Sequence, residues 1–176
     1  IDVPGSIFEF GVRWGRNMSL FTARRGIYEP YNYTRKLVGF DTFEGFPSVH
    51  DQDGDGEAAF IGNYSVTENY EDYLSSVLES LEKENPISHK QKFELVKGDA
   101  SKTVPTYMRD NPETTVALAY FDMDLYEPTR DCLQEIKSSL TKGSIVVFDE
   151  FNADEFPGET VALKEVFGAN NVALRR

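Results

Sequence analysis

Short apolar runs alternate with amphipathic segments along most of the chain. The runs are bounded by glycine, proline or acidic residues and cover residues 6–12, 36–41, 92–98, 115–122 and 143–149. Between them, the helical spacing of apolar residues predicts helices over 16–26, 67–84, 101–110, 127–140 and 159–168. Strands that alternate with helices favour a parallel sheet covered on both faces. We therefore expect an α/β fold with a doubly wound, mostly parallel sheet.

The boundaries of these segments carry further expectations. The clearest helix is 67–84, and Thr67 is its expected N-cap. The last residues, 171–174, have the pattern of a strand. The stretch 42–66 is rich in glycine and aspartate and is predicted to be a functional loop. Residues 1–176 make one domain, and a first strand that starts almost at residue 1 indicates part of a longer protein.

The balance of charge narrows the possible partners. The net charge is −12 and the sequence pI is about 4.6, which argues against nucleic acid and anionic membrane as partners. A small molecule is the expected ligand. One cysteine, Cys132, excludes an internal disulfide and a multi-cysteine zinc site. No signal pattern or membrane span is evident, so we expect a cytoplasmic protein; a homo-oligomer stays among the alternatives.

Acidic residues follow every predicted strand. In an open parallel sheet, ligands bind beyond the carboxyl ends of the strands, near the point where the strand order reverses. The candidate site residues at these ends are Glu9, Asp41, Asp99, Asp122, Asp124, Asp149 and Glu150.

The first strand runs into a glycine turn. Gly11 and Gly15 permit a tight turn and a close approach of the backbone to a ligand, although the same glycines could serve packing alone. The full G-x-G-x-x-G pattern of dinucleotide-binding domains is missing. Glu9 would repel a phosphate at this place and would suit an ammonium group.

Two aspartates have both a ligand-binding and a structural interpretation. Asp41 can accept both hydroxyl hydrogens of a ribose, or cap the turn at Thr42 and Phe43. Asp99 can bind an adenine amino group, or serve as N-cap of the helix that begins near Ser101. For Asp41 the ribose is favoured, and for Asp99 the two interpretations are nearly even.

The acids after the fourth and fifth strands form the strongest constellation. Asp122, Asp124, Asp149 and Glu150 are expected to converge, because these strands are predicted neighbours. Like charges at short distance force one group to keep its proton or destabilise the fold, unless a cation lies among them. Oxygen ligands favour Mg²⁺ or a similar divalent ion. The alternative is that these acids are solvated and cap helices.

The segment 51–62, DQDGDGEAAFIG, starts like a calcium-binding loop but ends incorrectly. Its twelfth position is Gly62, where such loops need a bidentate glutamate. We interpret the segment as part of a flexible, acidic lid from which His50 could face the site.

Taken together, the motifs resemble those of the macrocin-type O-methyltransferases, sugar methylases of antibiotic pathways with the class I methyltransferase fold. The matching segments are IFEFGVRWGRNMSLF, LVGFDTFEGFP, FELVKGDASKTVP, ALAYFDMDLYEPT and GSIVVFDEF. They span about residues 8–151, and their combination is specific. The resemblance implies a small-molecule acceptor, a sugar or a glycoside, and S-adenosylmethionine as the cofactor.

The resemblance also implies roles for individual residues. The cofactor residues would be Glu9, Gly11, Val12, Asn17, Asp41, Thr42, Asp99 and Ala100. Asp122, Asp149 and Glu150 would bind Mg²⁺, and Asp124 would be the general base that removes the proton of a metal-activated hydroxyl. The family commonly has aspartate where this chain has Glu150, and small residues where it has Arg16 and Asn17.

Three other interpretations compete with a sugar methylase. A metal-dependent methylase of catechols uses a similar acid cluster, but favours Asp-Asn where this chain has Glu150. A nucleotide-binding or metal-binding module without turnover is the second alternative. A nicotinamide-dependent oxidoreductase is disfavoured by Glu9 and by the incomplete glycine pattern.

Overall fold

A single parallel sheet forms the centre of the molecule. The computed structural model describes residues 2–54 and 56–175. The strand order is β3-β2-β1-β4-β5, and every neighbouring pair is parallel. The strands are β1 (Ser6–Phe10), β2 (Leu37–Asp41), β3 (Phe93–Lys97), β4 (Val116–Phe121) and β5 (Leu140–Phe148). The predicted α/β fold is confirmed.

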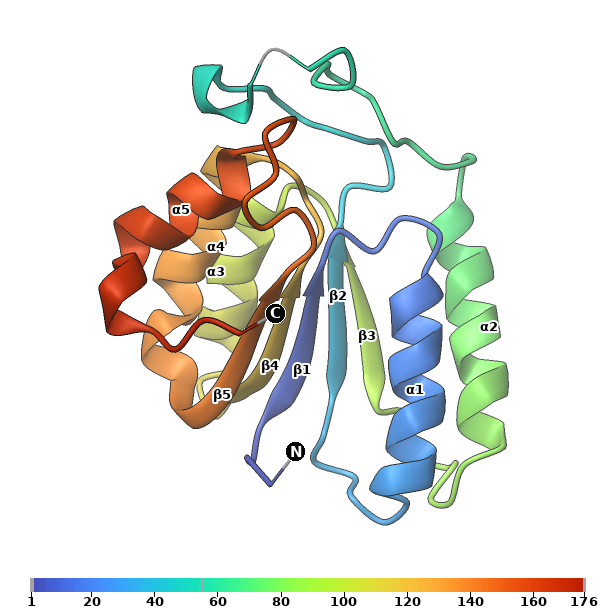
Figure 1. Cartoon of the computed structure of the whole chain (residues 1–176). Helices are drawn as coiled ribbons and strands as arrows, with labels where there is room; N and C mark the ends of the chain where they lie inside the picture. Colours follow the sequence, from blue (N-terminus) through green and yellow to red (C-terminus); the bar gives the residue numbers. More distant parts are fainter. Residues whose placement is uncertain (1, 55, 176) are drawn as a thin grey trace.

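Helices cover both faces of the sheet (Figure 1). α1 and α2 lie on one face, and α3, α4 and α5 lie on the other. Their bounds are α1 (Arg16–Tyr28), α2 (Tyr70–Lys83), α3 (Ala100–Asp110), α4 (Tyr126–Ile136) and α5 (Gly158–Val166), with short 3-10 helices at Asp51–Asp53, Lys137–Ser139 and Ala169–Asn171.

Aromatic rings fill the core between the sheet and the α3, α4 and α5 layer. Phe10 stacks on Phe121 at 4.4 Å between ring centroids and on Phe40 at 5.3 Å. These three side chains are fully buried. Because the rings come from three adjacent strands, their packing fixes the carboxyl ends of β1, β2 and β4 relative to one another. A second core, on the α1 and α2 face, includes Met18, Leu74 and Leu78.

Some predicted boundaries differ from those of the structure. Helix α2 begins at Tyr70, because Asn69 adopts a left-handed conformation with φ 57° that asparagine tolerates. Thr67 is therefore not its N-cap, and only the Thr67 carbonyl accepts the Tyr70 amide at 3.1 Å. Helix α4 ends at Ile136 and β5 begins at Leu140, so the predicted helix over 127–140 is too long.

The strand predicted over 171–174 is wrong. Ala169–Asn171 form a 3-10 helix, and residues 172–175 have no regular structure. Four alternating residues are too short a pattern to specify a strand, and this stretch pairs with no strand of the described residues.

The strand order reverses between β1 and β4. β1 leads into α1 on one face, whereas β4 leads into α4 on the other, which opens a crevice beyond their carboxyl ends. Residues 42–54 and 56–66 arch over this edge of the sheet (Figure 1). None of the helices in the described part of the chain combines the length and apolar character needed to cross a bilayer.

Candidate active site

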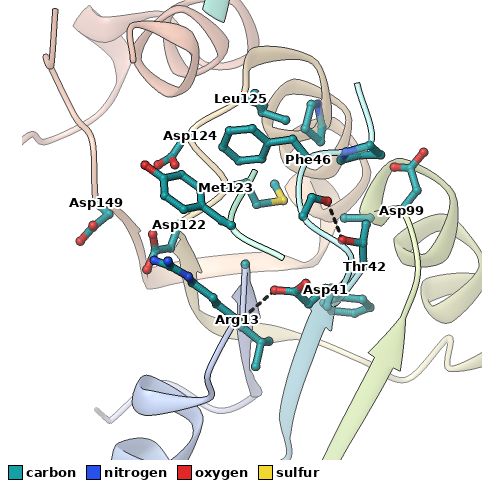
Figure 2. A pocket seen from close by; sticks show the side chains of 18 of the residues that line it. Arg13, Asp41, Thr42, Phe46, Asp99, Asp122, Met123, Asp124, Leu125 and Asp149 are labelled. Atoms are coloured by element: carbon teal, nitrogen blue, oxygen red, sulfur yellow. Dashed lines mark hydrogen bonds between the residues drawn. The ribbon is translucent and has the colours of Figure 1, made fainter. Parts of the chain in front are cut away.

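A cavity of about 450 Å³ opens at this crevice. It is lined by every predicted site residue except Glu9. Figure 2 shows Asp122, Asp124 and Asp149 on one side of the cavity, with Asp99 and Thr42 on the other. The structure thus brings both groups to one cavity, with Asp99 and Thr42 across from the acid cluster and Gly11 directly against Asp122. Their individual roles stay predictions.

The turn after β1 brings the backbone against the end of β4. Gly11 has φ 89°, and a Cβ atom there would lie 1.9 Å from the carbonyl oxygen of Asp122. Glycine is therefore required for packing, which was the alternative interpretation of this turn. Gly15 closes the turn by donating its amide hydrogen to Val12 at 2.8 Å, and α1 begins at the next residue.

Glu9 lies behind this turn with 1% of its surface exposed. Burial raises the pKa of its carboxyl group well above the usual value, against the lowering effect of hydrogen bonds from Asn17 and the Met18 amide. Its Oε2 atom is buried and has no hydrogen-bond partner. An unpartnered buried acceptor fits the predicted ammonium group of a methionine moiety, because a cation would satisfy both its charge and its lone pairs.

Asp41 at the end of β2 holds two turns in place. Its Oδ2 atom accepts the Arg13 amide at 2.7 Å (Figure 2), and its Oδ1 atom accepts the Phe43 amide at 2.6 Å. The structural role that competed with ribose binding is thus present. Each carboxylate oxygen has a second lone pair, so the ribose role stays compatible with these bonds.

Asp99 is the N-cap of α3. Its side chain accepts the Ser101 amide at 3.0 Å and forms an ion pair with Lys102 at 2.8 Å. The capping interpretation is therefore present here too, while Asp99 and Ala100 still line the cavity. Adenine binding by Asp99 stays a prediction.

The acids after β4 are poised between protonation states. Burial, and then the charge of Asp149, raises the pKa of Asp122 to about 6. Burial, and then the charge of Asp122, raises the pKa of Asp124 to about 7. Arg13 counteracts both shifts, and Arg16 counteracts that of Asp122. A carboxyl group whose pKa is near 7 can accept and release a proton at neutral pH.

The acids do not form a ready metal site. Within residues 2–54 and 56–175, no three aspartate, glutamate, histidine or cysteine side chains are gathered so that they could hold one ion. The oxygen-only side chains suit Mg²⁺ chemically, but the Asp149 carboxylate accepts the Tyr120 hydroxyl at 2.8 Å. Asp122, Asp149 and Glu150 therefore offer no preformed three-ligand set, and we derive no reaction step through a metal.

A cation–π contact that the sequence did not indicate closes one wall of the cavity. The guanidinium of Arg13 lies 4.5 Å from the ring centroid of Tyr64, and Phe46 packs edge-on against the same ring at 5.2 Å. Arg13 belongs to the glycine turn, whereas Tyr64 and Phe46 belong to the 42–66 loop. The contact therefore joins two segments that are far apart in the sequence and share no sequence motif that would have predicted it.

Two buried acids also escaped the sequence interpretation. Asp53 accepts the Tyr126 amide at 2.5 Å and the His50 amide at 2.6 Å, so it anchors part of the predicted lid to the start of α4. The His50 ring lies 5.2 Å from the Tyr126 ring and does not line the cavity. Glu159 is fully buried at the start of α5, and burial raises its pKa to about 8. Asp53 stands in the segment that resembles the start of a calcium-binding loop, which gave no sign of its anchoring role, and no motif marks Glu159.

The doubly wound sheet, with an acid-lined cavity at its switch point, is the architecture of the Rossmann-like methyltransferases. A family model of the macrocin-O-methyltransferases (TylF) matches residues 1–167. The chain belongs to the macrocin-O-methyltransferase family.

Solved structures agree with this assignment. A crystal structure of the calicheamicin methyltransferase CalS11 matches with a TM-score of 0.97 and 50% identity, over 99% of this chain and 68% of that one. An apo structure of CalS11, described as a TDP-rhamnose 3'-O-methyltransferase, gives a TM-score of 0.86 and 45% identity, over 99% and 67%. The O-methyltransferase NovP shares the fold, with a TM-score of 0.70 and 22% identity, over 99% and 67%.

Two curated proteins are more distant relatives. An 8-demethyl-8-(2,3-dimethoxy-alpha-L-rhamnosyl)-tetracenomycin-C 4'-O-methyltransferase of Streptomyces olivaceus is 27% identical over 86% of this chain and 55% of that protein. A demethyldecarbamoylnovobiocin O-methyltransferase of Streptomyces niveus is 28% identical over 85% and 54%. The chain spans about half the length of these curated relatives.

Proposed function

We propose that this chain transfers a methyl group from S-adenosylmethionine to a hydroxyl group of a rhamnose-type sugar. The main support is the cavity that joins the predicted cofactor residues to a buried aspartate, Asp124, whose pKa is about 7. The acceptor class is suggested by the rhamnose or rhamnosyl substrates named for CalS11 and for the Streptomyces olivaceus relative.

Some of the site residues would bind the cofactor, and others would take part in proton transfer. Bound S-adenosylmethionine supplies an electrophilic methyl group on a sulfonium centre. The unpartnered Oε2 of Glu9 would accept a hydrogen bond from the ammonium group, Asp41 would accept from the ribose, and Asp99 from the adenine. This division would place the methionine end of the cofactor beside Gly11 and next to the acid cluster, and the adenine end near Asp99.

Asp124 would take the proton from the acceptor hydroxyl. Its ionised form is substantially populated at and above neutral pH, because its pKa is about 7. General-base help of this kind contributes roughly 10²–10⁴-fold to the rate, and fixing the two partners at contact distance contributes more. Arg13 and Tyr64 would close the wall beside Asp124 and keep water away from it.

The test is binding and turnover with defined compounds. Calorimetry should show binding of S-adenosylmethionine, and TDP-rhamnose as acceptor should yield a methylated sugar and S-adenosylhomocysteine. A chain that binds no S-adenosylmethionine, with or without Mg²⁺, contradicts the whole proposal. Binding without methylation of TDP-rhamnose contradicts the acceptor alone.

The predicted dependence on Mg²⁺ is a separate and finer proposal. It is supported by the carboxylate oxygens of Asp122, Asp149 and Glu150 at one side of the cavity, although the described residues do not gather into a three-ligand set. Turnover is compared after exhaustive treatment with EDTA and after readdition of Mg²⁺. Full activity in EDTA would show that the reaction needs no divalent metal, and the proposed role of Asp124 would stand.

A further inference from the structure

The first turn of α5 lies directly against the reacting side of the cavity. A Cβ atom on Gly158 would come within 2.5 Å of the Tyr126 amide nitrogen and 2.9 Å of the Asp124 carbonyl oxygen. The helix therefore touches the backbone that follows β4, and only glycine leaves room for that contact. Thr160, two residues later, accepts the Asn152 amide at 2.7 Å. The same turn thus contacts the segment after β5.

Glu159, between these two residues, reaches both segments with one side chain. Its Oε1 atom accepts the Met123 amide at 3.2 Å, and its Oε2 atom accepts the Glu150 amide at 3.3 Å. The side chain is 0% exposed, so water offers no competing donor. A buried carboxyl group that divides its two oxygens between two loops holds their separation as well as their orientation.

The amides that Glu159 holds belong to the acid-bearing strand ends. The Met123 amide lies in the peptide bond that follows Asp122, and Met123 directly precedes Asp124. Asp124 itself has φ 61°, a left-handed conformation that aspartate tolerates better than most residues other than glycine. The Glu150 amide is the link to Asp149. Glu159 can therefore act on the direction of all four acids through the backbone.

We propose that Glu159 is a positioning residue, which locks residues 122–124 and 149–150 into one rigid unit so that Asp124 faces the acceptor hydroxyl. The inference rests on the proposed function, because that function makes the acceptor hydroxyl the group from which Asp124 takes a proton. It adds a residue that touches neither the cofactor nor the acceptor and that acts through backbone amides.

Amide hydrogen exchange of the complete chain tests the lock directly, without any acceptor. Exchange is compared at pH 9, above the pKa of Glu159 of about 8, where the wild-type carboxylate offers both oxygens; Glu159→Gln keeps the size of the side chain but leaves only one acceptor for the two amides. We expect about five- to tenfold faster exchange in peptides covering 121–126 and 148–153, with no change over 8–18. Glu79→Gln, the same substitution at an exposed position of α2 on the other face of the sheet, is the matched control and should change neither peptide.

A second variant separates the two contacts of the helix. Thr160→Val removes only the acceptor of the Asn152 amide and should accelerate exchange over 148–153 alone. It also keeps the inference testable if Glu159→Gln does not fold. Unchanged exchange over 148–153 in Thr160→Val, or over both peptides in Glu159→Gln, would overturn the lock.

Kinetics then decides whether the lock matters for the reaction. With TDP-rhamnose at pH 9, Glu159→Gln should lower kcat by about 10- to 100-fold while KM and the affinity for S-adenosylmethionine stay within about twofold, since only the orientation of Asp124 changes. Faster exchange with unchanged kcat would overturn the positioning role. If the wild-type protein does not methylate TDP-rhamnose, the acceptor proposal fails, and the exchange data alone support or overturn the lock.

Discussion

Replacing Asp124 by asparagine should lower activity and raise stability at the same time. The substitution suits the site, because Asp124 has φ 61° and asparagine tolerates this left-handed conformation as aspartate does. Alanine would add backbone strain and confuse the result. Asparagine cannot take a proton from a hydroxyl group, so kcat with TDP-rhamnose should fall by about 10²–10⁴-fold.

The expected gain in stability follows from the pKa of Asp124. Burial, and then the charges of Asp122, Glu150 and Asp149, raises it from 3.8 to about 7, and each pKa unit corresponds to about 1.4 kcal/mol. The folded chain retains this proton over a pH range in which the unfolded chain has released it, so the stability of the wild-type protein falls as the pH rises through this range. The raised pKa lowers the stability of the wild-type protein by up to about 4 kcal/mol at pH 8 and by about 2 kcal/mol at pH 5.

Chemical unfolding of both proteins at pH 8 and pH 5 measures this difference. The variant should be more stable at both values, and by more at pH 8. Calorimetry with S-adenosylmethionine provides the control, because the affinity should stay nearly unchanged. A variant that keeps normal turnover removes Asp124 from the mechanism. A variant that loses turnover but gains no stability at pH 8 would show that Asp124 is not held in the desolvated surroundings described here.

Three further substitutions test other parts of the cavity. Glu9→Gln should weaken S-adenosylmethionine binding by about 10- to 100-fold in calorimetry, because a charged hydrogen bond becomes neutral; unchanged affinity would separate Glu9 from the ammonium group. Asp53→Ala should lower the free energy of unfolding by about 0.5–2 kcal/mol, as for a lost helix cap, whereas the exposed Asp51→Ala in the same 3-10 turn should not; equal effects would contradict the anchoring role. Gly11→Ala should destabilise by more than about 1 kcal/mol in urea unfolding, because its methyl group meets the Asp122 carbonyl; a stable variant would contradict this tight turn.

The arrangement of strands and acids was predictable because it depends on local patterns. Apolar runs identified all five strands, and the rule that parallel strands place their carboxyl ends at one edge brought Asp41, Asp99 and Asp122 to one cavity. The ends of elements were less predictable where a single residue changes direction. Asn69 starts α2 in a left-handed conformation, which no periodicity of apolar residues can indicate.

The contacts that organise the site were not predictable because they are long-range and involve backbone donors. Asp53 accepts an amide 73 residues away, and Glu159 one 36 residues away. Any carboxylate can accept any free amide, so the residue type carries no information about the partner. Helix α4 illustrates this point: Leu125 at its N-cap position makes no side-chain cap, and the distant Asp53 supplies it.

The same limit explains why the acid cluster indicated a metal. Four carboxylates at two neighbouring strand ends repel one another unless their charge is reduced, and a divalent cation is the means that the sequence pattern suggests. The structure shows two other ways in which this repulsion is reduced. Asp122 and Asp124 have pKa values raised to about 6 and about 7, so protonation removes part of the negative charge, and Arg13 lies close enough to lower both. Because Arg13 precedes α1 in the glycine turn, its approach to the end of β4 depends on the strand order. The charge balance of the site is therefore a property of the topology, and this is why proton transfer by Asp124 can be proposed without a metal.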